Sequence, residues 1–327
     1  MDTAQPRQGD LISVVIPVYN EEANVADLCA ALREALGKLG RPWEVVLIND
    51  GSNDATAERL DAETARDARF TALHLRRNFG QTAAMAAGFD HARGEVLVAM
   101  DADLQNDPSD IPRLLALIDE GYDVVSGWRR HRQDKWLTRV LPSQMANWLI
   151  SRTTGVYLHD YGCSLKAYRR EILTDVRLYG EMHRFLPALC QWAGARIAEV
   201  EVEHHPRRHG KSKYGLSRIL RVLLDLTTVK FLMSYSTMPI RVFGPAGIAS
   251  FLVGLVLAGY LSWEKLARGA SIANRPALML AVLLMILGVQ FVSMGLLGEL
   301  VARTYYESQG KRVYAVRRVS GWGQERG

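Results

Sequence analysis

Two aspartates stand two residues apart in the stretch Asp101-Ala102-Asp103-Leu104-Gln105, directly after a short apolar run at 96–100. Carboxylates this close can jointly hold a hard divalent cation, because Mg²⁺ and Mn²⁺ prefer oxygen ligands and commonly bridge carboxylate to phosphate. Asp is also common in turns and helix caps, so the pair alone is a weak signal. Its place after an apolar run, like that of Asp50 after the run at 45–49, favours a metal site.

The apolar runs before these acids predict a buried parallel sheet. Residues 11–18, 45–49 and 96–100 are rich in Val and Ile and almost continuously apolar, as strands covered on both faces are. Segments 25–39 and 55–68 between them have helical patterns. Strand–helix alternation at this spacing is typical of βαβ units, so we expect an α/β domain.

Polar turns follow all three predicted strands: Tyr19-Asn20-Glu21, Asp50-Gly51-Ser52 and Asp101-Ala102-Asp103. Ligands of parallel sheets bind beyond the carboxyl ends of the strands, so these turns are expected to share one site. The sequence contains neither a GxGxxG fingerprint nor a GxxxxGK[ST] loop. The phosphate cradles of dinucleotide-binding and P-loop proteins are therefore missing.

Two long apolar segments near the C-terminus predict transmembrane helices. No charge occurs over 243–263 or over 276–298, and a helix of either length covers the ~30 Å hydrocarbon core of a bilayer. Buried helices of a soluble core are the alternative, but soluble helices this long nearly always carry a polar stripe. Seven basic residues lie in the outer flanks and three in the connector 264–275, which predicts cytosolic termini.

The segment 216–233, before the first span, is apolar except for a narrow polar stripe that includes Arg218, Arg221 and Asp225. Such a helix is suited to lie in the membrane interface, although docking on the soluble domain is an alternative. The predicted organisation is a polar tail at 1–10, an α/β domain at 11–213, an interfacial helix at 214–238, two spans within 239–300 and a basic cytosolic tail at 301–327.

The composition is that of an ordinary folded chain. The chain has 327 residues, 48% of them hydrophobic, and a formal net charge of +5, so it is not an intrinsically disordered protein. The positive charge is modest and spread along the chain, and we expect no nucleic-acid partner. Cys29, Cys163 and Cys190 are too few and too scattered for a disulfide framework or a thiolate zinc site.

Several segments together resemble family 2 glycosyltransferases, specifically the dolichol-phosphate mannosyltransferase-like branch that glycosylates polyprenyl phosphates. These segments are IPVYNEE, INDGSNDAT, MDADLQNDP, GWRRHRQDKW, HDYGCSLKAYRR, EMHRF and RRHGKSKYG. They cover roughly residues 11–235, and the two spans match the membrane-anchored bacterial members. The resemblance implies a GT-A fold, with a Rossmann-like and mostly parallel sheet, and inverting transfer of one sugar from a nucleotide sugar to a polyprenyl phosphate.

The resemblance also assigns residues to roles. It implies that the nucleotide sugar is held by Pro17, Tyr19, Glu21, Asp50, Asp101, Ala102 and Asp103. Asp101 and Asp103, with Gln105 as a further ligand, match the positions that bind Mg²⁺ or Mn²⁺ with the diphosphate. The chain has Asn49-Asp50 where many members have two acids, which leaves the choice between uracil and guanine open. HDYGCSLKAYRR also resembles formamido-arabinose transferases, whereas EMHRF resembles hexose transferases.

A basic cluster precedes the interfacial segment and contains Arg207, Arg208, Lys211 and Lys213. It is either a solvated run attracted to anionic lipid or, as the resemblance implies, a loop that closes on the donor diphosphate and acceptor phosphate. Arg129, in GWRRHRQDKW, is predicted to bind phosphate as well. The predicted catalytic residues are Asp103, Asp160, Arg129 and Arg207, and Asp160 is expected to orient groups or to act as a base.

The sequence therefore predicts an inner-membrane glycosyltransferase that uses a UDP-linked sugar and undecaprenyl phosphate on the cytosolic face. A processive polysaccharide synthase is an alternative, but the chain lacks a QxxRW box and has too few spans for a translocation channel. A non-catalytic nucleotide-binding scaffold is a second alternative. Gly288 and Gly295, seven residues apart in the second span, are compatible with close packing between protomers.

Overall fold

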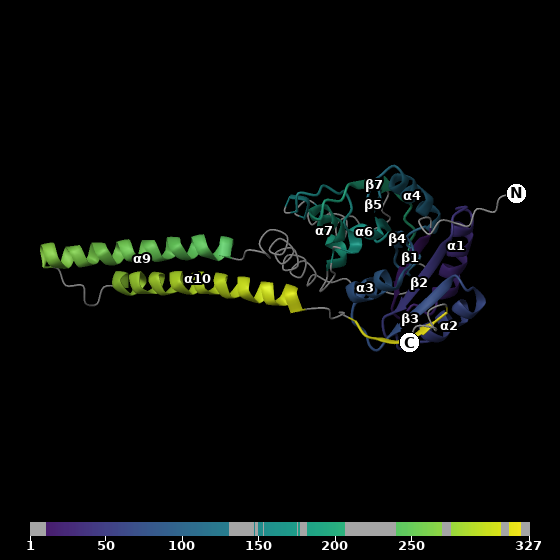
Figure 1. Ribbon diagram of the computed structural model, residues 1–327, viewed down its shortest axis with the longest axis horizontal. Helices are drawn as coiled ribbons and strands as arrows, with labels where there is room; N and C mark the ends of the chain where they lie inside the picture. Colours follow the sequence, from purple (N-terminus) through teal and green to yellow (C-terminus); the bar gives the residue numbers. More distant parts are fainter. Residues whose placement is uncertain are drawn as a thin grey trace. The chain divides into compact units, whose positions relative to one another are not determined.

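The structure is a computed structural model that describes residues 11–130, 147, 150–152, 154–174, 176, 182–206, 240–269, 276–308 and 314–321. It divides into two compact units. The α/β unit combines Met1–Leu226 with Arg312–Gly327, and the helical unit is Thr227–Lys311. Figure 1 shows a sheet with helices in the first and two long helices in the second. The N-terminal tail 1–10, the basic cluster and the predicted interfacial helix lie outside the described residues.

The α/β unit contains a mixed sheet with the strand order β7-β5-β6-β4-β1-β2-β3-β8 among the described residues. Four of its pairings are parallel (β1–β2, β1–β4, β2–β3 and β5–β7), whereas β6 and β8 run antiparallel to their neighbours. The strands are β1 Ile12–Val18, β2 Trp43–Asn49, β3 Phe70–Leu75, β4 Val96–Ala99, β5 Val124–Trp128, β6 Lys166–Arg169, β7 Ile197–Glu201 and β8 Val316–Ser320. The predicted α/β fold with a mostly parallel sheet is confirmed.

The three strands expected from the sequence are β1, β2 and β4, and they lie next to one another in the order β4-β1-β2. Every residue of β2 and β4 is buried, as is all of β1 except Pro17. Because these strands are parallel, their carboxyl ends meet at one edge of the sheet. The three polar turns expected to share a site therefore begin at the same edge.

Helices pack against the sheet. The α1 helix buries Val25, Leu28, Leu32 and Leu36 along one face, at the three- and four-residue spacing of a helix. These side chains join those of β1 and β2 in a single core. The helices of this unit are α1 Val25–Gly37, α2 Thr56–Arg66, α3 Gln81–His91, η2 Pro108–Asp110, α4 Ile111–Asp119, α6 Arg170–Thr174, η4 Met182–Phe185 and α7 Leu186–Trp192.

The C-terminal segment contains a strand as well as the basic residues that predict a tail. β8 pairs antiparallel with β3, with Ala72 opposite Ser320 and His74 opposite Arg318. Beside it, the Tyr314 hydroxyl donates a hydrogen bond to Asp90 Oδ2 at 2.7 Å. The chain thus returns to the α/β unit after the second long helix, so both ends of the helical unit connect to the same sheet-containing unit.

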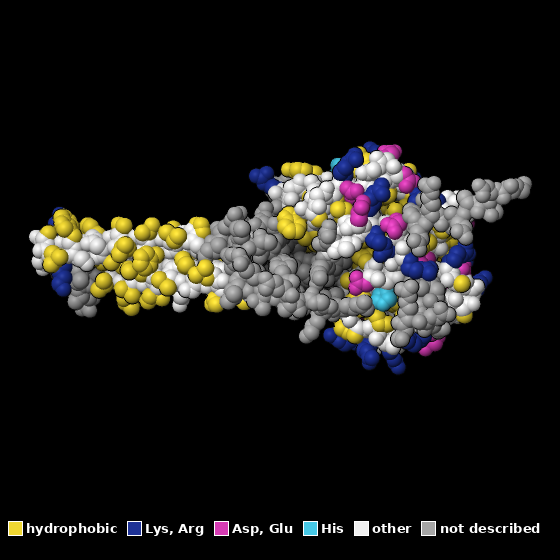
Figure 2. Space-filling view, viewed as in Figure 1, with side chains coloured by type: hydrophobic (Ala, Val, Ile, Leu, Met, Phe, Trp, Pro, Cys, Tyr) yellow, Lys and Arg dark blue, Asp and Glu magenta, His cyan; other side chains and the backbone are white. Residues whose placement is uncertain are grey.

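The helical unit consists of α9 Ile240–Arg268 and α10 Pro276–Ser308. Both contain segments long and apolar enough to cross a membrane, Phe243–Arg268 and Pro276–Gly298. In an 18-residue apolar stretch of each segment only 17% and 11% of the residues are buried, and Figure 2 shows hydrophobic side chains along the outside of both helices. Such exposure is unlike that of core helices, and the two predicted apolar helices are confirmed as candidate spans.

Small residues let α9 and α10 pack closely. A Cβ atom added at Gly288 would lie 2.7 Å from the Gly247 carbonyl oxygen, and one added at Gly254 would lie 2.7 Å from the Ala281 carbonyl oxygen. The Ser250 hydroxyl donates to the Leu284 carbonyl at 2.9 Å, so the helices also share a polar contact. Gly288 therefore serves packing within one chain, and packing between protomers stays a prediction.

Candidate functional site

Hydrogen bonds join the loops after β1 and β2. The Asn20 N–H donates to Ser52 Oγ at 3.0 Å, and Asn20 Oδ1 accepts from the Asn53 N–H at 2.9 Å. The Glu21 N–H donates to Thr56 Oγ1 at 3.0 Å. Asn20 has a φ of 55°, a left-handed conformation that Asn tolerates better than most residues. The loop carrying Tyr19 and Glu21 is therefore held against the turn carrying Asp50.

Asp50 is buried and accepts two backbone hydrogen bonds. Its Oδ1 accepts from the Phe79 N–H at 2.7 Å and its Oδ2 from the Gly80 N–H at 3.0 Å. Burial raises the pKa of Asp50, and these two donors work in the opposite direction. The predicted nucleoside-binding residue thus also fixes the start of α3 against the β2 turn.

Asp101 lies at the end of β4 and is held by groups far away in sequence. Its Oδ1 accepts a hydrogen bond from Gln81 Nε2 at 2.8 Å. Burial and the nearby charge of Asp103 both raise the pKa of Asp101, whereas a hydrogen bond from Ser164 and the charges of Arg129 and Lys166 act to lower it. A divalent cation beside the two carboxylates would relieve this repulsion.

The turn after Asp101 is tight. The Gln105 N–H donates to Asp103 Oδ1 at 3.2 Å, and Leu104 has a φ of 58°, a strained value for a bulky non-glycine residue. Ala102 and Asp103 are buried. Backbone strain of this kind is concentrated at functional sites, and here it folds the two acids and Gln105 into one turn.

The donor set of this turn fits a hard cation. Asp101, Asp103 and Gln105 offer carboxylate and amide oxygens, which Mg²⁺ and Mn²⁺ accept. Among the residues that the structure describes, no group of three or more His, Cys, Asp or Glu side chains could hold a metal ion. Two carboxylates suit a cation that takes its remaining ligands from phosphate and water, as Mg²⁺ commonly does.

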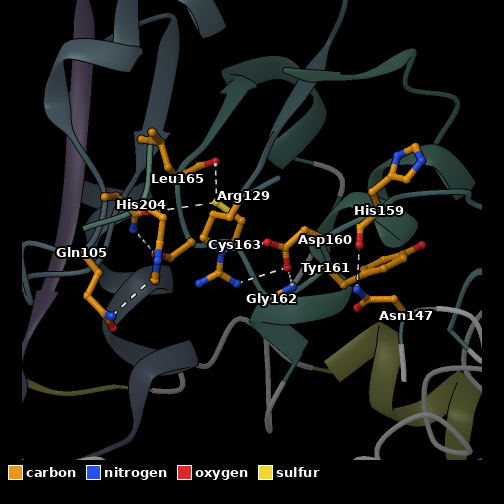
Figure 3. A network of polar contacts seen from close by, with 12 residues as sticks. Gln105, Arg129, Asn147, His159, Asp160, Tyr161, Gly162, Cys163, Leu165 and His204 are labelled. Atoms are coloured by element: carbon orange, nitrogen blue, oxygen red, sulfur yellow. Dashed lines mark hydrogen bonds and ion pairs between the residues drawn. The ribbon is translucent and has the colours of Figure 1, made fainter. Parts of the chain in front are cut away.

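Arg129 and Asp160 form a bidentate ion pair (Figure 3). Arg129 Nε donates to Asp160 Oδ2 at 2.7 Å and Nη2 donates to Oδ1 at 3.1 Å. Their side chains are 16% and 2% exposed. Burial opposes the charge of Arg129, but the hydrogen bonds and charge of Asp160 raise its pKa above the ordinary value. The structure joins two predicted catalytic residues, and this geometry favours an orienting role for Asp160.

Lys166 fixes the loop that follows Asp160. Its buried Nζ donates to the Tyr161 carbonyl at 3.1 Å and also to the Cys163 carbonyl. Burial lowers the pKa of Lys166 and raises that of the Cys163 thiol to about 11. Because a thiol with such a pKa is a poor nucleophile near neutral pH, Cys163 acts as a packing residue in this loop.

A pocket lies beside Asp101, lined in part by Pro17, Gln81, Asp101, Gly162, Ser164, Lys166, His183 and Arg184. The His183 ring is held against α3 by a hydrogen bond between its Nδ1 and Thr82 Oγ1 at 2.8 Å. No sequence pattern predicts a role for Gln81, Lys166, His183 or Arg184. Their roles depend on contacts across the fold, although His183 and Arg184 do lie in the EMHRF segment that carries the resemblance.

The residues just before the basic cluster are tied to the Asp101–Gln105 turn. The His205 N–H donates to the Gln105 carbonyl at 2.9 Å, and His205 Nε2 lies 2.9 Å from Asp107 Oδ2. His204 pairs with Asn106 in an isolated bridge, and its Nε2 lies 3.5 Å from Gln105 Nε2 (Figure 3). His204 and His205 therefore lie directly beside the candidate metal turn.

The predicted site residues divide into two groups. The structure describes Pro17, Tyr19, Glu21, Asp50, Asp101, Ala102, Asp103, Gln105, Arg129 and Asp160. It places Pro17 and Asp101 on the pocket and the remaining loop residues at the carboxyl edge of the sheet. Arg207, Arg208, Lys211 and Lys213 lie outside the described residues, so their phosphate-binding role stays a prediction.

Two known families match different parts of the chain. Residues 13–177 match the family described as Glycosyl transferase family 2. Residues 238–304 match the GtrB C-terminal hairpin. The first match covers β1 to β6 and their connections, and the second covers α9 and most of α10.

Sequence similarity to known proteins extends over nearly the whole chain. Dodecaprenyl-phosphate galacturonate synthase of Rhizobium johnstonii is 44% identical over 321 residues, which is 97% of this chain and 95% of the relative. Undecaprenyl-phosphate 4-deoxy-4-formamido-L-arabinose transferase of Pseudomonas aeruginosa is 42% identical over 318 residues, covering 96% of this chain and 92% of the relative.

A solved structure shares the fold of the α/β unit. The crystal structure of glucosyl-3-phosphoglycerate synthase from Mycobacterium tuberculosis, in complex with Mn²⁺ and uridine-diphosphate-glucose, matches with a TM-score of 0.53. The match covers 70% of this chain and 82% of that one at 20% identity. At this identity the likeness concerns the fold.

Proposed function

The chain belongs to glycosyltransferase family 2, and on that basis we propose that it transfers one sugar from a UDP-linked donor to undecaprenyl phosphate with inversion. The observation that carries the proposal is that three polar turns meet at one edge of the sheet. The chain also resembles polyprenyl-phosphate sugar transferases over nearly its full length. The pocket beside Asp101 receives the donor.

The donor site divides between two parts of the sheet edge. The loops after β1 and β2 hold the nucleoside through Pro17, Tyr19, Glu21 and Asp50. The β4 turn holds the diphosphate through Asp101 and Asp103, with Gln105 beside them. A bound Mg²⁺ or Mn²⁺ would neutralise charge on the departing nucleoside diphosphate. The structural neighbour that binds Mn²⁺ with uridine-diphosphate-glucose supports a divalent cation.

The acceptor needs little activation by a base. The second pKa of a phosphate monoester is about 6, so the lipid phosphate is largely a dianion at neutral pH. Catalysis then depends on bringing its oxygen to the sugar carbon and on holding its charge. Arg129, oriented by Asp160 at 2.7 and 3.1 Å, would contact this phosphate together with Arg207, Arg208, Lys211 and Lys213.

Connectivity supports a cytosolic active site. The chain leaves the α/β unit before α9 and re-enters it after α10, where β8 joins the sheet. If α9 and α10 cross the inner membrane as a hairpin, both of their outer ends therefore lie on the side of the catalytic unit. The excess of basic residues in these outer flanks supports a cytosolic location for that side.

The test is transfer of labelled sugar to undecaprenyl phosphate in detergent, with UDP-linked galacturonic acid and 4-deoxy-4-formamido-L-arabinose offered separately. These are the sugars named for the two relatives. We expect one labelled sugar per lipid, dependence on Mg²⁺ or Mn²⁺ and loss of transfer in excess EDTA. A polymeric product would establish a processive synthase. Binding of UDP without transfer of any sugar would favour the non-catalytic scaffold.

A further inference from the structure

Three polar side chains lie in one row across β2, β3 and β8. Asn49 on β2 is opposite His74 on β3 in the parallel pairing, and His74 is opposite Arg318 on β8 in the antiparallel pairing. His74 is only 4% exposed. Residues opposite each other on neighbouring strands lie close together on one face of the sheet, so this buried titratable ring lies between an amide and a guanidinium.

The contacts of His74 fix its protonation. Its Nδ1 lies 3.1 Å from Asn49 Nδ2, and its Nε2 lies 3.1 Å from Asp61 Oδ1 on α2. An amide NH₂ only donates and a carboxylate only accepts, so Nδ1 must be the acceptor and Nε2 must carry the proton. The orientation of the Asn49 amide follows from the hydrogen-bond network. His74 is therefore a neutral imidazole with its proton on Nε2.

Asn49 connects His74 to the turn that carries Asp50. While its Nδ2 donates to His74, its Oδ1 accepts a hydrogen bond from the Ser52 N–H at 2.9 Å. Ser52 Oγ in turn accepts from the Asn20 N–H at 3.0 Å. Asp50 lies inside the turn closed by the Asn49–Ser52 bond. The amide of Asn49 thus stabilises the turn that presents Asp50.

The C-terminal strand holds the other end of this network. Arg318 contacts both oxygens of Asp61, with Nη1 at 2.9 Å from Oδ1 and Nη2 at 2.5 Å from Oδ2. The Ser320 hydroxyl donates to Asp61 Oδ1 at 2.6 Å. Asp61 therefore meets His74 in an orientation set by two residues of β8.

We propose that β8 is a positioning element for the nucleotide site. Arg318 and Ser320 orient Asp61, Asp61 keeps the His74 proton on Nε2, and His74 holds Asn49 so that it closes the turn around Asp50. The proposal rests on the proposed function, because it takes the Asp50 turn to be part of the donor site. It makes the segment after the membrane hairpin a contributor to nucleotide affinity.

Protonation of His74 would break this network. A proton on Nδ1 would set two donors, that nitrogen and Asn49 Nδ2, against each other. The charged groups that face the ring are Asp61 and Glu58 from α2 and Arg318 from β8. Burial and the charge of Arg318 favour the neutral ring, whereas Asp61 and Glu58 favour the imidazolium. Changing Arg318 or Asp61 therefore shifts the protonation of His74 in opposite directions.

The test is UDP binding to the full-length protein in detergent with Mg²⁺ and without acceptor, measured by calorimetry between pH 5 and 8. We compare Arg318→Ala and Asp61→Asn with Arg317→Ala, which changes an exposed residue of the same strand. Loss of one positioning hydrogen bond is expected to weaken UDP binding about 3- to 10-fold in Arg318→Ala. Arg317→Ala should bind UDP like the wild type.

The pH profiles separate positioning from general stabilisation. Relative to wild type, the acidic loss of UDP affinity should begin at higher pH in Arg318→Ala and at lower pH in Asp61→Asn. Titration of UDP itself is common to all the proteins and cancels in the comparison. Unchanged UDP affinity and pH profile in both variants, with only a lower melting temperature, would overturn the proposal. A wild type that binds UDP but transfers no sugar would overturn the proposed function alone.

Discussion

Asp50 and Asp101 follow two strands of the same sheet, and burial raises the pKa of both. Their partners differ. Asp50 gives its two oxygens to the backbone N–H groups of Phe79 and Gly80. Asp101 accepts from the side chain of Gln81 and lies close to the second carboxylate of Asp103. Asp50 accepts hydrogen bonds that stabilise the fold, whereas Asp101 is repelled by the charge of Asp103.

This difference indicates what each acid does. A carboxylate that accepts backbone hydrogen bonds stabilises the local fold whether or not a ligand is present. A carboxylate beside another carboxylate destabilises the ligand-free fold and is stabilised by a cation. The two halves of the sheet edge should therefore respond differently to substitution, one in stability and the other in chemistry.

The largest effect is expected for Asp103→Asn. Removing one metal-binding carboxylate should slow sugar transfer by about 10³-fold. Without metal, the melting temperature should be unchanged or slightly higher, because the repulsion with Asp101 is relieved. Transfer of labelled sugar and thermal unfolding in EDTA measure the two quantities. If the variant retained half of the wild-type activity, the Asp101–Gln105 turn would have no essential role in sugar transfer.

A second, smaller effect is expected at the proposed binding site of the acceptor phosphate. Arg129→Lys keeps the charge but loses the two-pronged contact with Asp160. Misplacing this charge should lower kcat by about 10²-fold while the affinity for UDP, measured without acceptor, stays near that of wild type. The matched control is Arg130→Lys, which changes the next residue, whose exposed side chain pairs with Glu201. Equal losses in the two variants would contradict a specific role for Arg129.

The sequence was sufficient to find the acids because each combines a distinctive residue type with a position after an apolar run. Asp50, Asp101 and Asp103 are examples. Gln81 and Lys166 could not be found in this way. Gln81 reaches Asp101 from 20 positions away, and Lys166 acts through the carbonyl groups of a loop. Such contacts exist only after the sheet has brought distant segments together.

Strands were predicted best where both faces are buried. β1, β2 and β4 are nearly continuous apolar runs, whereas β8 has the sequence Val-Arg-Arg-Val-Ser and only its last residue is buried. Edge strands tolerate charged residues, so the sequence of β8 has no apolar run and predicts a basic tail. What makes it a strand is its pairing with β3. The partnership of Arg129 with Asp160, 31 residues apart, is equally invisible in the sequence.

The third prediction concerns stability at the nucleoside end. Asp50→Ala leaves the buried N–H groups of Phe79 and Gly80 without their acceptors. Because each hydrogen bond to a charged group contributes about 1.5–3 kcal/mol, and relief of the buried charge offsets part of the loss, unfolding should cost about 2–4 kcal/mol less. Thermal unfolding in EDTA measures this loss. If Asp103→Ala were equally destabilising under the same conditions, the contrast between the two acids would disappear.

The smallest effect is expected at Asp67, a carboxylate away from the sheet edge. Hydrogen bonds from Arg69 are the chief reason that the pKa of Asp67 falls to about 2, and Arg33 adds to the shift. Because the pKa is lower in the folded state, this carboxylate stabilises the fold at pH values above its unfolded-state pKa of about 3.9. The contribution is lost as the pH falls toward 2. Asp67→Asn should lower the free energy of unfolding by about 1 kcal/mol at pH 7, the upper range for a pair near the surface.

The sign of the pH dependence sets Asp67 apart from Asp50. The raised pKa of Asp50 means that protonating it costs the folded state less than the unfolded one, so its burial penalty declines on acidification. For Asp67 the stability difference between wild type and Asp67→Asn should instead shrink as pH falls from 5 to 3. Thermal unfolding at pH 7, 5, 4 and 3 follows this difference, with Glu120→Gln as a control at an exposed residue. A difference independent of pH would mean that Asp67 stabilises the fold through packing and not through its charge.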